Sequence, residues 1–158
     1  MIITQLKPNQ VFVFGSNLQG FHGAGAAGYA SFGEHGNVWR KHNYAQKPSG
    51  WKGEWNQKGV ASGPQEGTHG KSYAIPTVTR PGAKRSIPLT DIRNSVKNLM
   101  AYAASMPHLE FLVVYTGNSH NLNGYTAQEM ASTFAFPDIP QNILFEEHFL
   151  KLINESKN

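Results

Sequence analysis

A continuous apolar run, Val11 to Phe14, leads directly into a glycine-rich polar turn, and this combination limits the possible folds more than any other feature. Short apolar runs of this kind are typical of strands that are covered on both faces of a parallel sheet. The turn begins with Gly15-Ser16-Asn17 and continues through further glycines into a small-residue stretch that favours a helix start. We therefore predict a buried strand, a glycine-rich loop and a helix over 25–32.

A strand that leads through glycines into a helix N-terminus is suited to holding phosphate. The loop N–H groups and the positive end of the helix dipole point at the anion, and glycine allows its close approach. The spacing Gly20-x-x-Gly23-x-Gly25 matches neither the dinucleotide fingerprint nor the P-loop, because no Lys-Ser or Lys-Thr follows. The segment therefore indicates either an anion-binding loop or a structural turn.

Length and composition indicate a single globular domain over 1–158. The net charge of +4 suits an anionic ligand, but the basic residues are scattered rather than gathered in a nucleic-acid stripe. The chain has no Cys, which excludes disulfides and thiolate metal sites. It shows neither a signal peptide nor an apolar stretch of membrane length. We therefore expect a cytoplasmic protein without a membrane partner.

Strands alternating with helices along the chain predict an α/β fold with a mostly parallel sheet. Further strands are expected over 59–62, 72–75, 110–115 and 142–145, with Pro76 ending the second of these. Helices are expected over 91–105, 126–134 and 146–153. Thr90 is the expected N-cap of the first, and Thr126 with Glu129 forms a capping box for the second. The buried face of the first helix is expected to contain Ile92, Val96, Leu99 and Ala103.

The stretch over 37–58 differs in composition from the rest of the chain. It contains all three tryptophans, Trp39, Trp51 and Trp55, among several basic residues, and hydrophobic periodicity is lost. This pattern predicts an inserted loop rather than a second domain. The indoles either cover the core or stack on bases. An alternative function is therefore a nucleic-acid or protein-binding module that acts through this loop.

Three predicted strands end in loops rich in glycine and small polar residues, after Phe14, after Ser62 and after Tyr115. In an open parallel sheet, ligands bind beyond the carboxyl ends of the strands. Three loops of this type at one edge favour a pocket for a phosphorylated, nucleotide-like ligand over three structural turns. In the third loop Asn118, Ser119 and Asn121 add hydrogen-bonding groups but no strong base, which suits binding better than proton transfer.

Three blocks of the sequence resemble the macro domain superfamily, and especially small macro-like proteins of bacteria and phages. They are FVFGSN-x-x-G-x-HG-x-GAA over 12–27, the region of Gly67 and GKSYAIPT over 70–77, and TG…NGY-x-x-x-E with a following Phe over 116–134. Macro domains bind ADP-ribose or remove it from proteins. The resemblance thus implies a three-layer α/β/α sandwich whose ligand is ADP-ribose or a related NAD-derived nucleotide, without a cofactor.

In macro domains two glycine-rich loops embrace the diphosphate and the distal ribose. By position, the resemblance implies that Asn17 lies near this ribose and that Tyr125 packs against it. If the protein is catalytic, the implied reaction is hydrolysis of an ADP-ribosyl linkage through a water positioned by Asn17, with His22 assisting. The implied ligand-binding residues are Gly15, Ser16, Gly20, Gly23, Ala24, Gly25, Thr116, Gly117, Asn118, Ser119, Gly124 and Tyr125.

Several candidate residues also have an ordinary structural interpretation. His22 either contacts phosphate as a donor or acid–base group, or satisfies a loop carbonyl. Asn17 either contacts the ligand or bonds its own backbone in a turn. The pair Glu66 and His69 is either a carboxylate–imidazole pair or part of an exposed loop.

No metal site is predicted, because the spacing of His22, His69 and His120 matches no metal-binding motif. The run Glu146-Glu147-His148 is interpreted as a solvent-exposed helix start without a further role.

Overall fold

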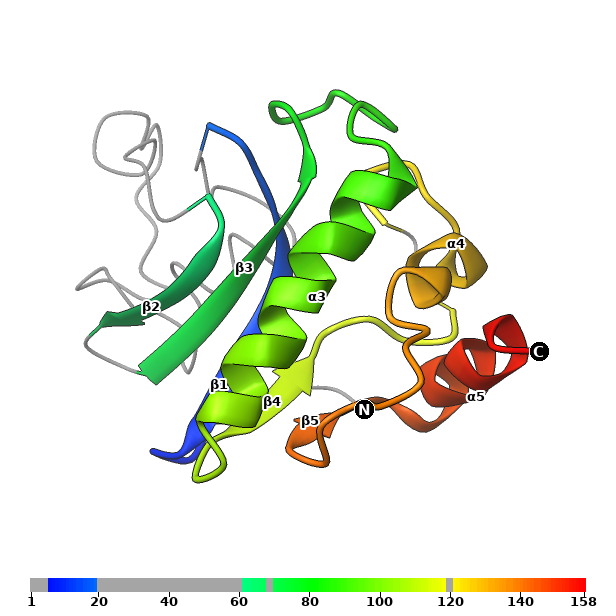
Figure 1. Cartoon of the computed structure of the whole chain (residues 1–158). Coiled ribbons are helices and arrows are strands. Elements are labelled where there is room, and N and C mark those ends of the chain that lie inside the picture. Colours follow the sequence, from blue (N-terminus) through cyan, green and yellow to red (C-terminus); the bar gives the residue numbers. More distant parts are fainter. Residues whose placement is uncertain (1–5, 20–60, 68–69, 119–120) are drawn as a thin grey trace.

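The computed structural model describes residues 6–19, 61–67, 70–118 and 121–158 of the chain, and its elements are labelled in Figure 1. The helix expected over 25–32 and the Trp-rich stretch over 37–58 lie outside the described residues.

The described strands form a single five-stranded sheet in the order β2-β3-β1-β4-β5. The central strand β1 (Gln10–Asn17) pairs in parallel with β3 (Gly70–Val78) on one side and with β4 (Glu110–Val113) on the other. The two-residue strand β5 (Ile143–Leu144) extends the parallel sheet beyond β4, whereas β2 (Gly63–Gly67) is an antiparallel edge. The predicted α/β fold with a mostly parallel sheet is confirmed.

The described helices are α3 (Leu89–Ser105), α4 (Ala127–Ser132) and α5 (Glu147–Ser156), and they pack on one face of the sheet. Their buried residues join Val11 and Val13 of β1 in the main core, while Phe12 and Phe14 belong to a second cluster on the opposite face. The described helices therefore form one layer against the sheet. The three-layer sandwich is not confirmed.

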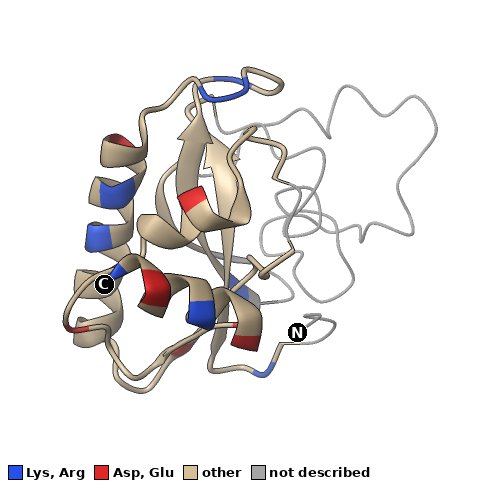
Figure 2. Ribbon diagram, turned by 90° about the vertical axis from the view of Figure 1, so that its right-hand side faces the viewer, with Lys and Arg blue, Asp and Glu red and all other residues tan. Residues whose placement is uncertain are grey.

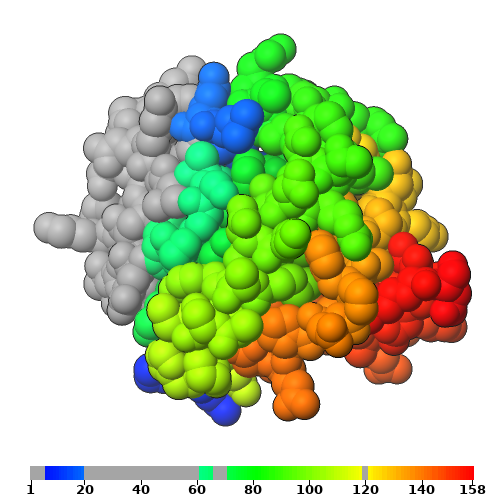
Figure 3. Space-filling model, viewed as in Figure 1, coloured from blue at the N-terminus to red at the C-terminus, as the bar shows by residue number. Residues whose placement is uncertain are grey.

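The C-terminal part of the chain packs directly beside α3, as the space-filling view of Figure 3 shows. Arg93 of α3 donates hydrogen bonds of 2.9 Å to the carbonyl oxygens of Ser132 and Ala135, and its guanidinium lies 4.0 Å from the ring centroid of Phe136. These contacts fix the position of α4 and the segment after it relative to α3. None of the described helices has the length and apolar character needed to cross a bilayer.

The segment over 63–70 differs from the predicted loop. Its first part is β2, which pairs antiparallel with β3 from Gly63↔Ala74 to Gly67↔Gly70. Gln65 stands opposite Ser72 and donates to its hydroxyl at 3.0 Å, a cross-strand contact that stabilises a strand of low intrinsic propensity. Because Gly70 begins β3, this end of the hairpin lies at the amino edge of the parallel strands. The prediction that the segment after Ser62 forms a glycine-rich loop at the carboxyl edge is therefore wrong.

Pro76 does not end its strand as predicted, because β3 continues to Val78. Pairing with β2 stops at Ala74, so the missing N–H of Pro76 interrupts no bond on that side. On the other side the register with β1 shifts between Ser16 and Asn17. Proline is tolerated at unpaired edges and bulges for this reason.

The predicted helices over 91–105, 126–134 and 146–153 are present, but their ends and one of the two predicted N-caps differ from the prediction. The expected buried face of α3 is confirmed, but α3 begins at Leu89 with Pro88 as N-cap, so Thr90 is not the cap. The capping box at Thr126 and Glu129 is confirmed, although α4 ends at Ser132 rather than 134. The observed β4, β5 and α5 also differ from their predicted ranges at the ends, where one strand or helix passes into a loop.

Candidate functional site

The chain leaves β1 and β4 in opposite directions along the sheet. After β1 it continues to β2 and β3 on one side, and after β4 it continues to α4 and β5 on the other. In open α/β sheets, ligands bind outside the carboxyl ends of the strands at such a switch point. The sheet order therefore brings two of the predicted loops, those that follow Phe14 and Tyr115, to neighbouring parallel strands.

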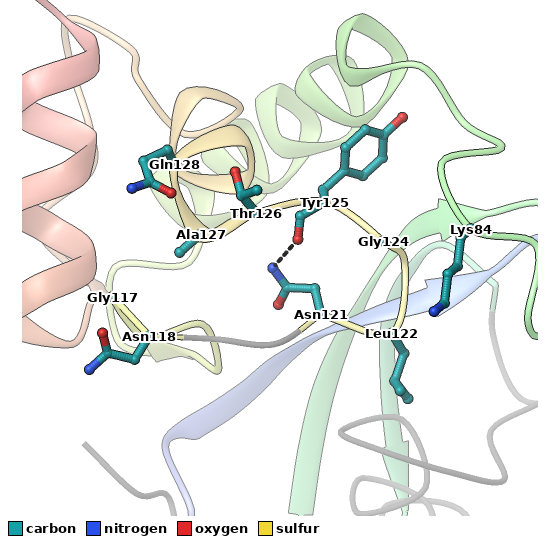
Figure 4. Close-up of a pocket in the computed structure, with 10 residues that line it drawn as sticks. All are labelled: Lys84, Gly117, Asn118, Asn121, Leu122, Gly124, Tyr125, Thr126, Ala127 and Gln128. Carbon is teal, nitrogen blue, oxygen red and sulfur yellow. Dashed lines mark hydrogen bonds between the residues drawn. The ribbon is translucent and has the colours of Figure 1, made fainter.

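A cavity of about 670 Å³ opens in the second of these loops, between the start of α4 and the connection from β3 to α3 (Figure 4). Four of the residues that the sequence predicts to bind ligand line this cavity, namely Gly117, Asn118, Gly124 and Tyr125. Thr116, also predicted, does not line it. The remaining described residues of its lining are Lys84, Asn121, Leu122, Thr126, Ala127 and Gln128. The cavity is thus built mainly by one loop and completed by two neighbouring segments.

Residues 15–17 lie at the end of β1 and not on the wall of this cavity. Ser16 and Asn17 are buried, and the Ser16 hydroxyl donates to the carbonyl oxygen of Ala61. The N–H of Leu18 still bonds the carbonyl oxygen of Val78, so the sheet extends through the whole of this segment. The other predicted residues of the first loop (Gly20, His22, Gly23, Ala24 and Gly25) and Ser119 lie outside the described residues, as do His69 and His120.

Gly15 is required by the packing of Tyr115. A Cβ at Gly15 would lie 2.6 Å from the Tyr115 hydroxyl oxygen and 3.3 Å from Thr77 Oγ1. The Tyr115 ring stacks on Phe149 with centroids 5.7 Å apart, so it has little room to move. Its hydroxyl is buried and has no hydrogen-bond partner among the described residues, and burial raises the pKa of Tyr115. A structural role therefore accounts for Gly15 without any ligand.

The side chain of Tyr125 belongs to the core rather than to the cavity. Its hydroxyl donates to the carbonyl oxygen of Ile87 at 2.5 Å, and the Arg85 guanidinium lies 4.6 Å from its ring centroid. In Figure 4 the ring points away from the other residues that line the cavity, while its carbonyl oxygen accepts a bond of 2.9 Å from Asn121 Nδ2. The geometry thus gives Tyr125 a backbone contribution to the site and does not support the expected ring contact with a ribose.

Arg85 and Glu129 form a clamp that holds the connection between β3 and α3 against the loop of the cavity. The guanidinium donates two parallel hydrogen bonds of 2.9 and 2.8 Å to the carboxylate, and the Arg85 backbone N–H donates to the carbonyl oxygen of Asn123 at 2.7 Å. Arg85 has a φ of 55°, which costs a non-glycine residue roughly 1–2 kcal/mol. The bond from Arg85, followed by that from the Thr126 N–H, lowers the pKa of Glu129 to about 2.

Glu146 has a role at this site that the sequence pattern does not reveal. It was expected to be solvent-exposed, but only 7% of it is exposed, and it caps α5 by accepting the N–H groups of His148 and Phe149. It also accepts the N–H of Gly117 at 2.7 Å and contacts the His148 ring nitrogen Nδ1 at 2.8 Å. The bonds from the His148 and Gly117 N–H groups lower the pKa of Glu146 to about 2. The exposed side chain of His148 agrees with the prediction.

Gly117 is the point at which the loop of the cavity meets α5. A Cβ at this position would lie 2.5 Å from the Cβ of His148, so only glycine fits without displacement. No local sequence signal links Gly117 to Glu146, since the two residues are far apart along the chain. Within the described part of the chain, no group of three or more His, Asp or Glu side chains is placed to hold a metal ion.

Comparison of the chain with models of protein families, with curated proteins and with solved structures found no match.

Gly15→Ala should lower the free energy of unfolding by about 1–3 kcal/mol, because the new Cβ overpacks the Tyr115 hydroxyl. Tyr115→Phe alone should leave stability equal or higher, since it removes a buried hydroxyl without a described partner. In the Tyr115→Phe background, Gly15→Ala should cost clearly less. Urea unfolding of the four proteins of this double-mutant cycle measures the coupling. Equal costs in both backgrounds would show that the hydroxyl does not exclude the side chain.

Glu146→Gln should weaken the dependence of stability on acid pH. The pKa of Glu146 is lowered in the folded protein, so its ionisation stabilises the fold above its ordinary pKa of 4.5, and this contribution is lost as pH falls toward about 2. Between neutral pH and about pH 3, the Tm of the wild type should therefore fall further than that of the variant. Glu147→Gln, at the exposed neighbouring position, is the matched control and should behave as the wild type. Identical pH profiles for the wild type and Glu146→Gln would contradict the assignment.

Proposed function

We propose that this chain binds a phosphorylated nucleotide of the ADP-ribose class in the cavity between the β4–α4 loop and the β3–α3 connection. The main support for the proposal is the position of the cavity in the loop that follows β4, because β4 is one of the two neighbouring strands from which the chain departs in opposite directions. This is also the loop in which the macro-domain resemblance places a ligand. A volume of about 670 Å³ lies within the range of pockets that bind small molecules and cofactors.

The chemistry of the described lining favours binding of a polar, anionic ligand. Asn118, Gln128 and Thr126 supply amide and hydroxyl groups, and Lys84 supplies a positive charge. The described lining contains no carboxylate that would repel phosphate. Amides and hydroxyls recognise sugar hydroxyls and phosphate oxygens by hydrogen bonds.

Binding is the primary activity in this proposal, because the described lining has no carboxylate or imidazole to act as a general base. Hydrolysis at the distal ribose, which the resemblance implies, would depend on Asn17 and His22. Asn17 is buried at the end of β1. A hydrolase that uses Asn17 should lose turnover of an ADP-ribosylated protein in the Asn17→Ala variant while it retains its affinity for ADP-ribose.

Calorimetric titration with ADP-ribose, AMP, NAD and a short single-stranded oligonucleotide tests the proposal. ADP-ribose should bind, and Asn118→Ala should weaken this binding about fivefold, as expected for the loss of one hydrogen bond of about 1 kcal/mol. Asn118 is exposed, so its substitution should leave the fold intact. Asn98→Ala, at an exposed position of α3 away from the cavity, is the matched control and should bind as the wild type.

The absence of heat with ADP-ribose, AMP and NAD would contradict the proposal. Binding of the oligonucleotide alone would favour the alternative function through the Trp-rich stretch over 37–58. Unchanged affinity of Asn118→Ala, or equal weakening by the substitutions at Asn118 and Asn98, would contradict binding of ADP-ribose in this cavity.

A further inference from the structure

Lys84 is the one charged side chain in the described lining of the cavity. The other described lining residues are neutral amides, a hydroxyl, glycines and apolar or aromatic groups. In Figure 4 Lys84 extends along one side of the cavity, opposite Gly117, Asn118 and Gln128. A cationic group therefore faces a set of neutral hydrogen-bonding groups across the space that a ligand would fill.

The charge of Lys84 is not neutralised within the described part of the chain, where this residue forms no ion pair. The neighbouring cation differs, because Arg85 forms an ion pair with Glu129 at 2.8 Å. Figure 2 shows the basic residues of this connection in the loop beyond the strand arrowheads, at the carboxyl end of the sheet. The position next to Arg85 thus provides a positive charge that is available to an anion.

The backbone of Lys84 is held in place from both sides. Its N–H donates to the carbonyl oxygen of Gly82 at 3.0 Å. A Cβ added at Gly124 would lie 2.9 Å from the Cβ of Lys84, so the two loops pack closely at this point. The adjacent Arg85 keeps its positive φ while its guanidinium binds Glu129 of α4. The clamp therefore fixes the starting point of the Lys84 side chain relative to the cavity.

We infer that Lys84 is a specificity-determining residue that binds a phosphate group of the ligand. The inference rests on the proposed function and extends it to a single residue and a single chemical group. A lysine ammonium is a compact point charge with three donors, and it is a common partner of phosphate oxygens. The cavity should then discriminate phosphorylated nucleotides from nucleosides through this charge.

The test compares Lys84→Gln, which removes the charge but keeps much of the side chain, with Lys84→Arg, which retains the charge. Calorimetric titrations use ADP-ribose, inorganic pyrophosphate and adenosine as ligands. Lys84→Gln should bind ADP-ribose about fivefold more weakly than the wild type, and its affinity should depend less on salt. Lys84→Arg should retain most of the affinity. Lys97→Gln, at an exposed position of α3, is the matched control and should bind as the wild type.

The outcomes separate the inference from the proposed function. Unchanged affinity of Lys84→Gln for ADP-ribose, or an equal loss with adenosine, would overturn the role of Lys84 and leave nucleotide binding intact. If pyrophosphate binds as tightly as ADP-ribose and Lys84→Gln weakens its binding, the nucleoside part of ADP-ribose adds no affinity. This result would support recognition of an anion by Lys84 and contradict the nucleotide assignment. No binding of ADP-ribose or pyrophosphate to the wild type would overturn both.

Discussion

Burial of β1 on both faces is the constraint on which the rest of this structure depends. Val11 and Val13 pack against the helices, and Phe12 and Phe14 are buried on the opposite face. A strand of this kind is stable only in the interior of a sheet, so β3 and β4 flank it in parallel. The chain leaves β1 and β4 in opposite directions, and the cavity forms in the loop that follows β4.

The cavity owes its shape to contacts that bind its loop from two sides. Glu129 joins the start of α4 to Arg85, and Glu146 joins the start of α5 to the N–H of Gly117. In both cases a carboxylate accepts several hydrogen bonds, which lowers its pKa and favours its ionised form. Glycines complete the arrangement where the backbones approach too closely for a side chain, at Gly117 and Gly124. A polar loop without a core of its own is thereby fixed to the packed helices.

Local patterns predicted the parts of the fold that depend on local interactions. The apolar run of β1, the helical spacing of the α3 core residues and the capping box at Thr126 were all read correctly. The sequence did not reveal β2, because its glycines suggest a loop and its stability depends on pairing with β3. The contact of Glu146 with Gly117 and the position of Lys84 on the cavity wall were not predicted for a similar reason, since both depend on residues that lie far away along the chain.

The central claim is that the ligand occupies the carboxyl edge of the sheet, beside the loop over 116–125. Titration of the isotope-labelled protein with ADP-ribose, followed by the chemical shifts of its backbone amides, tests this claim most directly. The largest changes should fall on the residues that line the cavity, among them Lys84, Gly117 and Gln128. Changes confined to the opposite edge, around Lys71 and His108 in the smaller cavity of about 350 Å³, would contradict the account.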